Sequence, residues 1–379
     1  MSSTVSLWLI FFSSLFLVVL SNQYSVYTIS IFGDRKYDYK EKIFYSIVII
    51  LMSMFIGLRI WCNDTGTYRE IYDYLTPSTG NILDGISWAI GDSPAFSIFN
   101  TILKHLNVST QNFLMIYAFI TVTLYLWFIR KYTTDLTLSI FLLWTMGVYI
   151  FAAAGMRQAV AIAIGLIGID RFLQKKWIGF IGWICFATFF HPYTILYLLA
   201  PIMTFSPWTK KTGWLFAIFA IIGVFLQSFI GIILDITSAL GKMYGNTEFS
   251  GEGVNIFRFL VVWAPIVLSF LAHNSIKESI DKENNLFMNF SMLNAAIMFV
   301  ALFGTANYFA RLANYFLVFQ TLSLPWMLKY FNNNSRKLLR SIIVICYLLY
   351  FIFTHMILTP FDQYFAKMTL WEYLLSVFK

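Results

Sequence analysis

Arg157 and His191 are the residues whose types and positions most directly suggest chemistry. Arg157 lies where one long apolar run ends and the next begins, and His191 lies near the middle of the apolar run 177–205. Charged or titratable side chains at membrane depth are energetically costly and mark a functional site by default. A guanidinium can bind an anion through several N–H donors, and an imidazole can exchange a proton near neutral pH.

Three further arginines, Arg59, Arg258 and Arg311, lie at the ends of other apolar runs. An arginine beside a helix N-terminus adds its charge to the positive end of the helix dipole, and together they form an anion site. The alternative for each is a side chain that extends to the lipid headgroups without binding a specific ligand.

Polar residues close in sequence to these arginines complete the set of candidates. Asp64 and Tyr68 follow Arg59, and Asp64 is near enough to pair with it, to orient a hydroxyl or to act as a base. Gln158 could donate to the same ligand as its neighbour Arg157, and Tyr315 follows Arg311 by one helical turn. His191 is either a general base, a donor to an anion, or a satisfied histidine at a helix break.

The composition predicts an all-α polytopic transmembrane helical bundle. The chain has 379 residues, of which 59% are hydrophobic and 12% are charged, and its mean hydropathy is +0.72. Soluble domains carry about 25% charged residues. No polar stretch is long enough for a separate soluble domain, so we expect residues 1–379 to form one integral membrane domain. The net charge of +8 lies mostly in short loops between apolar runs, which indicates topology and contact with membrane lipid rather than nucleic acid.

The apolar runs predict about 11–12 spans. They lie at about 5–28, 43–60, 112–129, 136–153, 158–173, 177–190, 193–205, 213–235, 256–273, 287–304, 309–328 and 341–358.

The distribution of lysine and arginine orients these spans. With the N-terminus outside, the inner loops hold 17 of the 26 Lys and Arg residues. This count requires 177–205, which is too short for two full spans, to enter and leave on the same side. We therefore predict a broken hairpin with its tip near His191-Pro192, because proline disfavours helix at its own position and at the residue before it.

This topology places Arg59, Arg157, His191, Arg258 and Arg311 at the outer ends of spans. The positive-inside bias depletes that side of cations, so the arginines there indicate an anionic partner at the outer membrane surface. Two external loops, 61–111 and 236–255, face the same side, and Pro94–Leu106 has the spacing of an interfacial amphipathic helix.

The sequence gives no reason to expect a metal or a cofactor. The three cysteines, Cys62, Cys185 and Cys346, are far apart and do not have the spacing of a metal site. Glycines occur in 236–255, but no strand precedes them, so they do not form a phosphate-binding fingerprint.

The motifs together resemble the EpsG-like and Wzy-like polymerases of bacterial surface polysaccharides. The resemblance covers about Gly57 to Tyr315, and His191 is followed by proline where that family usually has a small residue. It rests on Arg59 with Asp64-Thr65 and Tyr68, Asp92 to Phe96, Arg157, His191 in the stretch FFHPY, and Arg311 with Tyr315.

The resemblance implies a multi-pass enzyme of the bacterial cytoplasmic membrane whose active site faces outside. Such an enzyme makes exopolysaccharide, capsule or O-antigen. It transfers a glycan from undecaprenyl diphosphate to a hydroxyl of another lipid-linked repeat unit, and works with a flippase and a chain-length regulator. The implied clamp for the diphosphate is Arg157 and Arg311 with Arg59 third, His191 is the implied base, and Asp64 orients the acceptor. Arg258, Gln158, Tyr68 and Tyr315 complete the expected substrate-binding set.

Two other classes of protein fit the same residues. A flippase for lipid-linked oligosaccharide would also need cations for the diphosphate, but the arginines lie at one face rather than along a midplane path, and the chain lacks paired halves. A glycan ligase or an acyltransferase with His191 as base is the second alternative.

Overall fold

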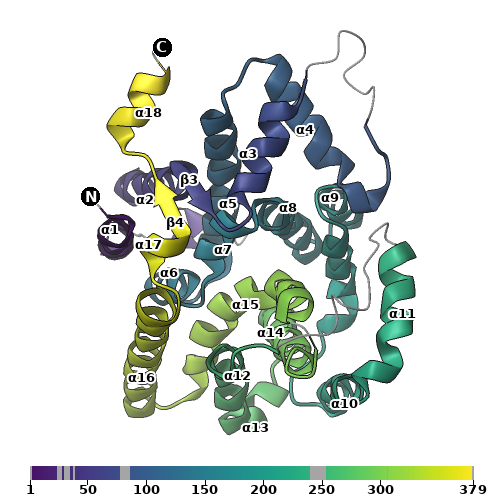
Figure 1. The fold of residues 1–379 in the computed structure, drawn as a ribbon. Coiled ribbons are helices and arrows are strands. Elements are labelled where there is room, and N and C mark those ends of the chain that lie inside the picture. The colour runs from purple at the N-terminus through teal and green to yellow at the C-terminus, as the bar shows by residue number, and fades with distance from the viewer. Residues whose placement is uncertain are drawn as a thin grey trace.

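The computed structural model describes residues 2–23, 28–29, 35–36, 39–76, 86–239, 253–304 and 306–377, and these are almost entirely helical, as predicted (Figure 1). The elements are α1 (Ser3–Gln23), β1 (Thr28–Ile29), β2 (Arg35–Lys36), α2 (Tyr39–Gly57), β3 (Arg59–Cys62), α3 (Thr65–Tyr74), η1 (Ile90–Asp92), α4 (Pro94–His105), α5 (Thr110–Tyr132), α6 (Leu136–Thr145), α7 (Val148–Ala154), α8 (Met156–Leu173), α9 (Trp177–Thr188), η2 (Pro192–Met203), α10 (Lys210–Val224), α11 (Leu226–Ala239), α12 (Ile256–Leu271), α13 (His273–Lys277), α14 (Lys282–Val300), η4 (Ala306–Ala310), α15 (Arg311–Met327), η5 (Leu328–Tyr330), α16 (Asn333–Ile352), η6 (Phe353–Leu358), α17 (Phe361–Tyr364), β4 (Phe365–Lys367) and α18 (Leu370–Val377).

Three of the described helices, α1, α5 and the α16–η6 helix, are long and apolar enough to cross a membrane, and the number rises to five if each of two bent pairs is one span. This is fewer than the 11–12 spans predicted from apolar runs. Several runs form helices shorter than a bilayer requires, such as the 12-residue α9 and η2 and the 16-residue α12. The predicted span 136–153 is divided into α6 and α7 by a 45° bend at Gly147, whose φ of 81° suits glycine.

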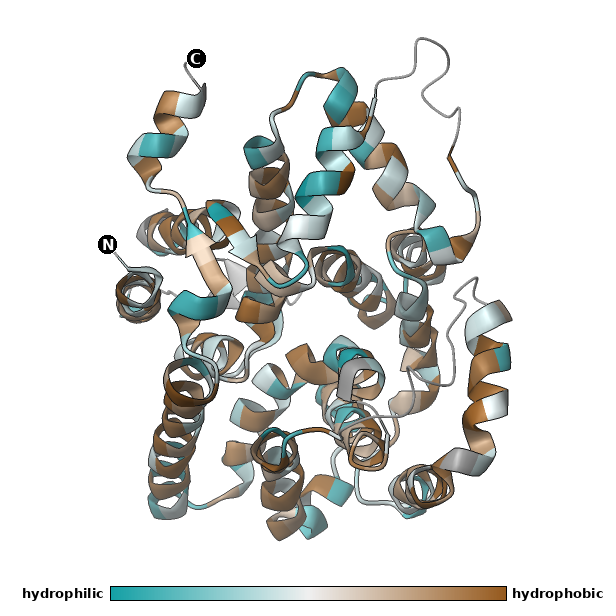
Figure 2. Ribbon diagram, viewed as in Figure 1, coloured by the Kyte–Doolittle hydropathy of each residue, from teal (hydrophilic) through white to brown (hydrophobic). Residues whose placement is uncertain are grey.

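The outer faces of several helices are apolar, in keeping with a lipid environment. On α1, the exposed residues Leu9, Phe12 and Phe16 recur every three or four positions, and α16 exposes Ile342, Ile345 and other apolar residues in the same way. Figure 2 shows α1 and α16 as predominantly hydrophobic, whereas α3 carries hydrophilic segments. Contiguous apolar surface of this kind indicates contact with a membrane rather than with water.

Polar side chains lie inside the bundle, between α14 and α15. Asn294 donates to the carbonyl of Ala313 at 2.5 Å and Gln320 donates to the side-chain oxygen of Asn294 at 3.0 Å. One turn away, the buried hydroxyls of Ser291 and Ser323 lie 2.7 Å apart. Interhelical hydrogen bonds of this type hold membrane helices in register, and here they fix the helix that begins with Arg311.

The chain breaks between α9 and η2 where the sequence predicted it. His191 has an extended backbone, with φ −155° and ψ 123°, and Pro192 is the first residue of η2. Proline has no N–H to lose at the first position of a helix, so it starts η2 while preventing α9 from continuing.

The two arms of this break form a hairpin against α8. Ile184 of α9 lies at Gly168, near the end of α8, and Phe190 beyond α9 lies in the apolar cluster at the start of α8. The chain then returns, and Tyr197 of η2 packs against Gly165, whose missing side chain permits the close approach. The tip of the hairpin therefore lies beside the start of α8.

The predicted external loop 61–111 is largely structured. It contains β3, α3 and η1, and the helix expected at 94–106 is α4. β3 pairs antiparallel with β4 near the end of the chain, with Arg59 opposite Lys367 and Cys62 opposite Phe365 (Figure 1). Most of the other predicted loop, 236–255, lies outside the described residues.

Ion pairs gather at the opposite end of α8 from Arg157. Asp170, near the end of α8, accepts from Lys131 and from Tyr132 of α5, and Glu41 of α2 pairs with Arg130. Buried carboxylates are stable when paired in this way. Some of the basic residues on the predicted inner side therefore neutralise carboxylates of the protein itself.

Candidate active site

The first residues of α3, α8 and α15 meet beside the hairpin tip. Asp64, which precedes α3, has its carboxylate 3.6 Å from the guanidinium of Arg311, the first residue of α15. Gln158 in the first turn of α8 donates to the carbonyl of Arg311 at 2.7 Å. The N-termini of α3 and α8, each with a partial positive charge, therefore lie in one region with Arg311, where α15 continues directly from the π-helix η4.

Arg157, in the first turn of α8, has a guanidinium that is only partly matched by the protein. Its Nε is enclosed, and among the described residues it has no hydrogen-bond partner. The guanidinium lies 5.9 Å from the centre of the Phe96 ring at the start of α4. Buried donors are nearly always hydrogen-bonded in folded proteins, so an enclosed N–H without a protein acceptor is a donor that a ligand or a water could satisfy.

Arg311 is the more accessible of the two arginines. Its side chain is 51% exposed and that of Asp64 is 33% exposed. An exposed ion pair at this distance contributes at most about 1 kcal/mol to stability. The guanidinium of Arg311 can therefore exchange Asp64 for another anion at little energetic cost.

Arg59 differs from its expected role, because it is fully buried. Its side chain is 0% exposed and donates to the carbonyl of Ile56 at 2.7 Å, to the hydroxyl of Thr65 at 3.0 Å and to the sulfur of Met156 at 3.1 Å. Burial lowers its pKa from 12.5 to about 10. The pairing expected between Arg59 and Asp64 is wrong, since Asp64 pairs with Arg311.

The contacts of Arg59 instead join the elements that carry the site. Thr65 is the first residue of α3 and Met156 is the first residue of α8. The guanidinium thus holds together two helix starts, one next to Asp64 and the other next to Arg157.

Tyr68 lies between the charged residues. Burial raises the pKa of its phenol. The positive charge of Arg157 lowers that pKa, but by less than burial raises it. The phenol also hydrogen-bonds the backbone of Arg157, with Asp64 and Arg311 nearby. Its hydroxyl is therefore a protonated donor at neutral pH, placed among the residues with which it was predicted to act.

His191 and Tyr315 form the second part of the site. The hydroxyl of Tyr315 and Nδ1 of His191 are hydrogen-bonded to each other. Tyr315 is buried, one turn after Arg311 in α15, and its carbonyl accepts a 2.6 Å bond from Tyr197 of η2. α15 therefore carries both an arginine of the anion region and the partner that fixes the imidazole.

Two other predicted residues have protein partners. The amide of Gln158 bonds the backbone of Arg311, so it connects α8 to α15 rather than reaching outward. Arg258 of α12 donates to the side-chain oxygen of Asn314 at 3.0 Å, and Asn314 directly precedes Tyr315. Arg258 thus reaches the same turn of α15 from a different helix.

The start of α4 contributes a residue that was not predicted as part of the site. Phe96 lies under Arg157, 5.9 Å from the ring of Tyr68 and 5.2 Å from that of Tyr117. The N–H of Ala95 donates to the carbonyl of Phe189 at 3.1 Å, which fastens α4 to the hairpin tip. The sequence signals here were the proline that opens α4 and the family resemblance of the stretch from Asp92 to Phe96.

A metal ion has no evident ligand set here. Within the described part of the chain, no group of three or more His, Cys, Asp or Glu side chains could hold one. The positive charge of the region comes instead from guanidiniums and helix N-termini.

Comparison with protein families gives one match that covers most of the chain. The EpsG family matches over residues 42–373, a range that includes every candidate residue described above. No curated protein and no solved structure matches the chain.

Proposed function

The chain belongs to the EpsG family, whose members are Wzy-like polysaccharide polymerases, and we propose a specific reaction for it. It transfers a glycan from undecaprenyl diphosphate to a hydroxyl of a second lipid-linked repeat unit, at the outer face of the bacterial cytoplasmic membrane. The observation that carries this proposal is the enclosed Nε of Arg157, which has no hydrogen-bond partner in the described part of the chain and lies in the region where Arg311 meets the starts of α3 and α8.

The diphosphate is the leaving group, and its charge develops as the bond to the sugar breaks. Preorganised donors in a site with little water stabilise such developing charge well. Arg157 and Arg311 supply two guanidiniums, and the start of α8 adds backbone N–H groups that helices leave without partners. Arg311 releases Asp64 as the diphosphate enters.

The acceptor hydroxyl loses its proton as its oxygen bonds the anomeric carbon. His191 takes that proton through Nε2, which requires the neutral tautomer with hydrogen on Nδ1. In that tautomer the Nδ1–H donates to the hydroxyl oxygen of Tyr315, which holds the ring in position. The proton ends on the imidazole and the electron pair of the broken bond ends on the diphosphate, so charge balances across the site.

Asp64 orients the acceptor. Once Arg311 has turned to the diphosphate, the Asp64 carboxylate can accept from a sugar hydroxyl beside the reacting one. Tyr68 donates to the same sugar or to the phosphate, and Phe96 offers an apolar face. Arg59, Gln158 and Arg258 act in this proposal by holding helix starts in place, because their donors bond other residues.

The test uses a strain whose only copy carries Arg157→Ala, with mass spectrometry of the lipid-linked glycans and a label that reaches only the outer face. We expect polymer to disappear while single repeat units accumulate outside. Arg171→Ala is the matched control, because Arg171 lies near the other end of α8, where its guanidinium donates to the side-chain oxygen of Gln174 at 3.5 Å.

The location of the accumulated units separates the possible classes of protein. Single units that accumulate on the inner face would show that the protein is a flippase. Full-length polymer that stays on its lipid would indicate a ligase. Unchanged polymer in Arg157→Ala would remove Arg157 from the site and overturn the proposed mechanism.

A further inference from the structure

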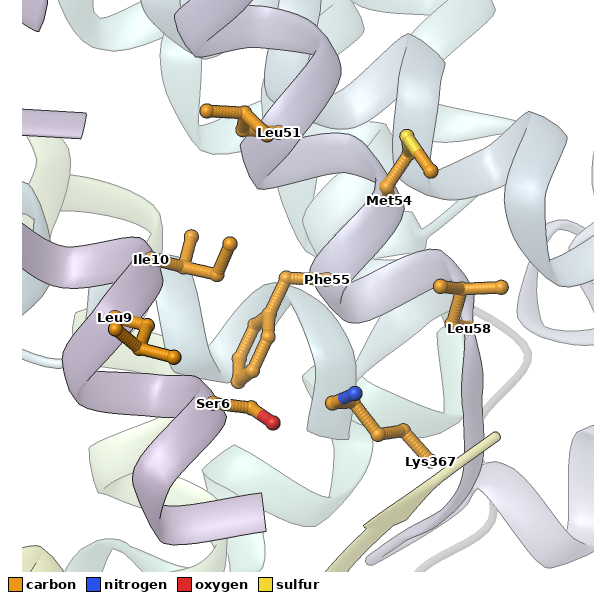
Figure 3. A pocket seen from close by; sticks show the side chains of 8 residues that line it. All are labelled: Ser6, Leu9, Ile10, Leu51, Met54, Phe55, Leu58 and Lys367. Carbon is orange, nitrogen blue, oxygen red and sulfur yellow. The ribbon is translucent and has the colours of Figure 1, made fainter. Parts of the chain in front are cut away.

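A groove between α1 and α2 is separate from the candidate active site. It has a volume of about 180 Å³ and is lined mainly by apolar side chains of α1 and the last turns of α2 (Figure 3). Neither α8 nor α15, which carry Arg157 and Arg311, contributes to its lining. The lining residues are Ser6, Leu9, Ile10, Leu51, Met54, Phe55, Leu58 and Lys367.

The groove opens on a surface that faces lipid. Leu9, on one wall, belongs to the exposed apolar stripe of α1 that also includes Phe12 and Phe16. A hydrocarbon chain that entered from the membrane would replace contact with other lipid by contact with the walls. The shape and chemistry of the groove therefore suit an acyl chain.

Lys367 places a single positive charge at one end of this apolar groove. Figure 3 shows its side chain reaching from β4 with the ammonium turned toward Ser6 and Phe55. Burial lowers the pKa of this ammonium and the charge of Glu372 opposes that shift, but no carboxylate lies within ion-pair distance of it among the described residues. A partly desolvated ammonium without a carboxylate in direct contact gains stability from an anion bound beside it.

Two carboxylates that flank β4 in sequence accept hydrogen bonds from other groups. Asp362 accepts from the backbone N–H and the hydroxyl of Thr4, at 2.9 Å and 2.7 Å. Glu372 accepts from the N–H of Thr369 at 2.6 Å and thereby caps α18. Both carboxylates thus have hydrogen-bond partners of their own, which leaves the ammonium of Lys367 open to direct contact with a bound anion.

The surroundings of Lys367 place it at the level of lipid headgroups. Trp61 of β3 lies opposite Ala366, next to Lys367, and is 51% exposed. Trp371, at the start of α18, is exposed as well. Exposed tryptophans of this kind concentrate at the membrane–water interface.

We propose that this groove binds one anionic phospholipid, with an acyl chain between α1 and α2 and the phosphate on Lys367. A phospholipid fits better than a prenyl diphosphate, because one ammonium balances one phosphate whereas a diphosphate requires the paired arginines of the candidate active site. The bound lipid fills the space beside the β3–β4 pair and so supports the strand from which Arg59 projects.

The test measures which lipids remain on the protein. The full-length protein is reconstituted in nanodiscs of equal phosphatidylglycerol and phosphatidylcholine, released into mild detergent and analysed by native mass spectrometry. We expect wild-type protein to retain phosphatidylglycerol preferentially. Lys367→Gln should lower that preference about fivefold, the equivalent of about 1 kcal/mol for one basic residue near a charged headgroup.

Two further variants act as controls. Lys104→Gln removes another lysine of the predicted outer side, one that donates to backbone carbonyls at 3.0 and 3.2 Å, and should leave the preference unchanged. Leu51→Trp fills the groove and should reduce the retention of both lipids, whereas Leu349→Trp on the exposed face of α16 should not. Size-exclusion elution at the wild-type position establishes that each variant is folded.

Some results would overturn the proposal. An unchanged preference in Lys367→Gln would show that the ammonium does not bind the headgroup. Equal losses in Lys367→Gln and Lys104→Gln would show a general charge effect. Displacement of phosphatidylglycerol by farnesyl diphosphate at lower concentration than by added phosphatidylglycerol would assign the groove to a prenyl diphosphate.

Discussion

Arg59→Met removes a buried guanidinium and leaves an apolar side chain of similar length in its place. Two large contributions to stability are lost together and nearly cancel. Burial lowers the pKa of the guanidinium to about 10, which corresponds to a few kcal/mol against the charged form in the folded protein. The hydrogen bonds to Ile56 and Thr65 oppose this, at about 1.5–3 kcal/mol each for a charged donor.

The net change is set by the group that the substitution leaves without a partner. The hydroxyl of Thr65 still donates to the carbonyl of Cys62 at 2.7 Å, so it remains satisfied. The carbonyl of Ile56 lies in the last turn of α2, where no helical N–H follows to replace the guanidinium. One unsatisfied buried carbonyl costs about 1–3 kcal/mol, and we expect the free energy of unfolding to fall by that amount.

Polymer synthesis should fall much further than stability, by at least tenfold, because Arg59 joins the helix starts next to Asp64 and Arg157. Thermal unfolding of the purified protein and the yield of polymer in a strain with only the variant measure the two effects. Arg59→Lys should also fail, since an ammonium cannot bond Ile56, Thr65 and Met156 with the same geometry. Wild-type polymer yield in Arg59→Met would refute the positioning role, and a loss of stability far above 3 kcal/mol would refute the cancellation.

Three further predictions concern the site and the hairpin. Asp64→Asn should leave the unfolding temperature nearly unchanged, because an exposed ion pair contributes at most about 1 kcal/mol to stability. The yield of polymer should fall in the same variant. An unchanged yield would exclude a role for Asp64 in the reaction. His191→Ala should lower turnover about 10²–10⁴-fold, the usual effect of losing a general base. Tyr315→Phe should lower turnover less, and neither variant should change KM much. A change in KM alone would contradict the proposed roles. Gly165→Ala should destabilise the protein by about 1–3 kcal/mol, because the new Cβ would lie 2.7 Å from the ring of Tyr197 in η2. Gly182→Ala, where the new Cβ would have no atom within 4 Å, should be neutral or stabilising. Equal unfolding temperatures for the two variants would contradict the hairpin packing.

The position of the helices could be predicted from the sequence, and so could the break at His191-Pro192. Apolar runs and proline act locally, so they identify where a helix lies and where it stops. The number of spans could not be predicted in this way. Hydropathy does not distinguish a run that crosses a bilayer from one that forms a 12-residue arm such as α9 or η2.

The residue types of the candidate site could also be identified in the sequence, but their pairings could not. Arginines at the starts of α8 and α15 could be identified from their place beside apolar runs. The partner of Asp64 could not, because Arg311 comes from a distant helix and Arg59 lay closer in the sequence. Whether an arginine is exposed or enclosed depends on tertiary packing, and this is why Arg59, expected to bind phosphate, instead bonds Ile56, Thr65 and Met156.

The pairing of β3 with β4 has a consequence for how the protein is assembled during synthesis. β3 leaves the ribosome early, but the strand that covers its edge follows only after everything from Asn63 to Tyr364 has been made and inserted. Until then the backbone groups of β3 that later bond β4 have no strand partner, and Arg59 projects from a strand that is not yet held on that side. This end of the bundle is thus closed by a segment made after all the helices from α3 to α17, so translation that stops before Phe365 leaves those helices made but the wall beside the candidate active site unfinished.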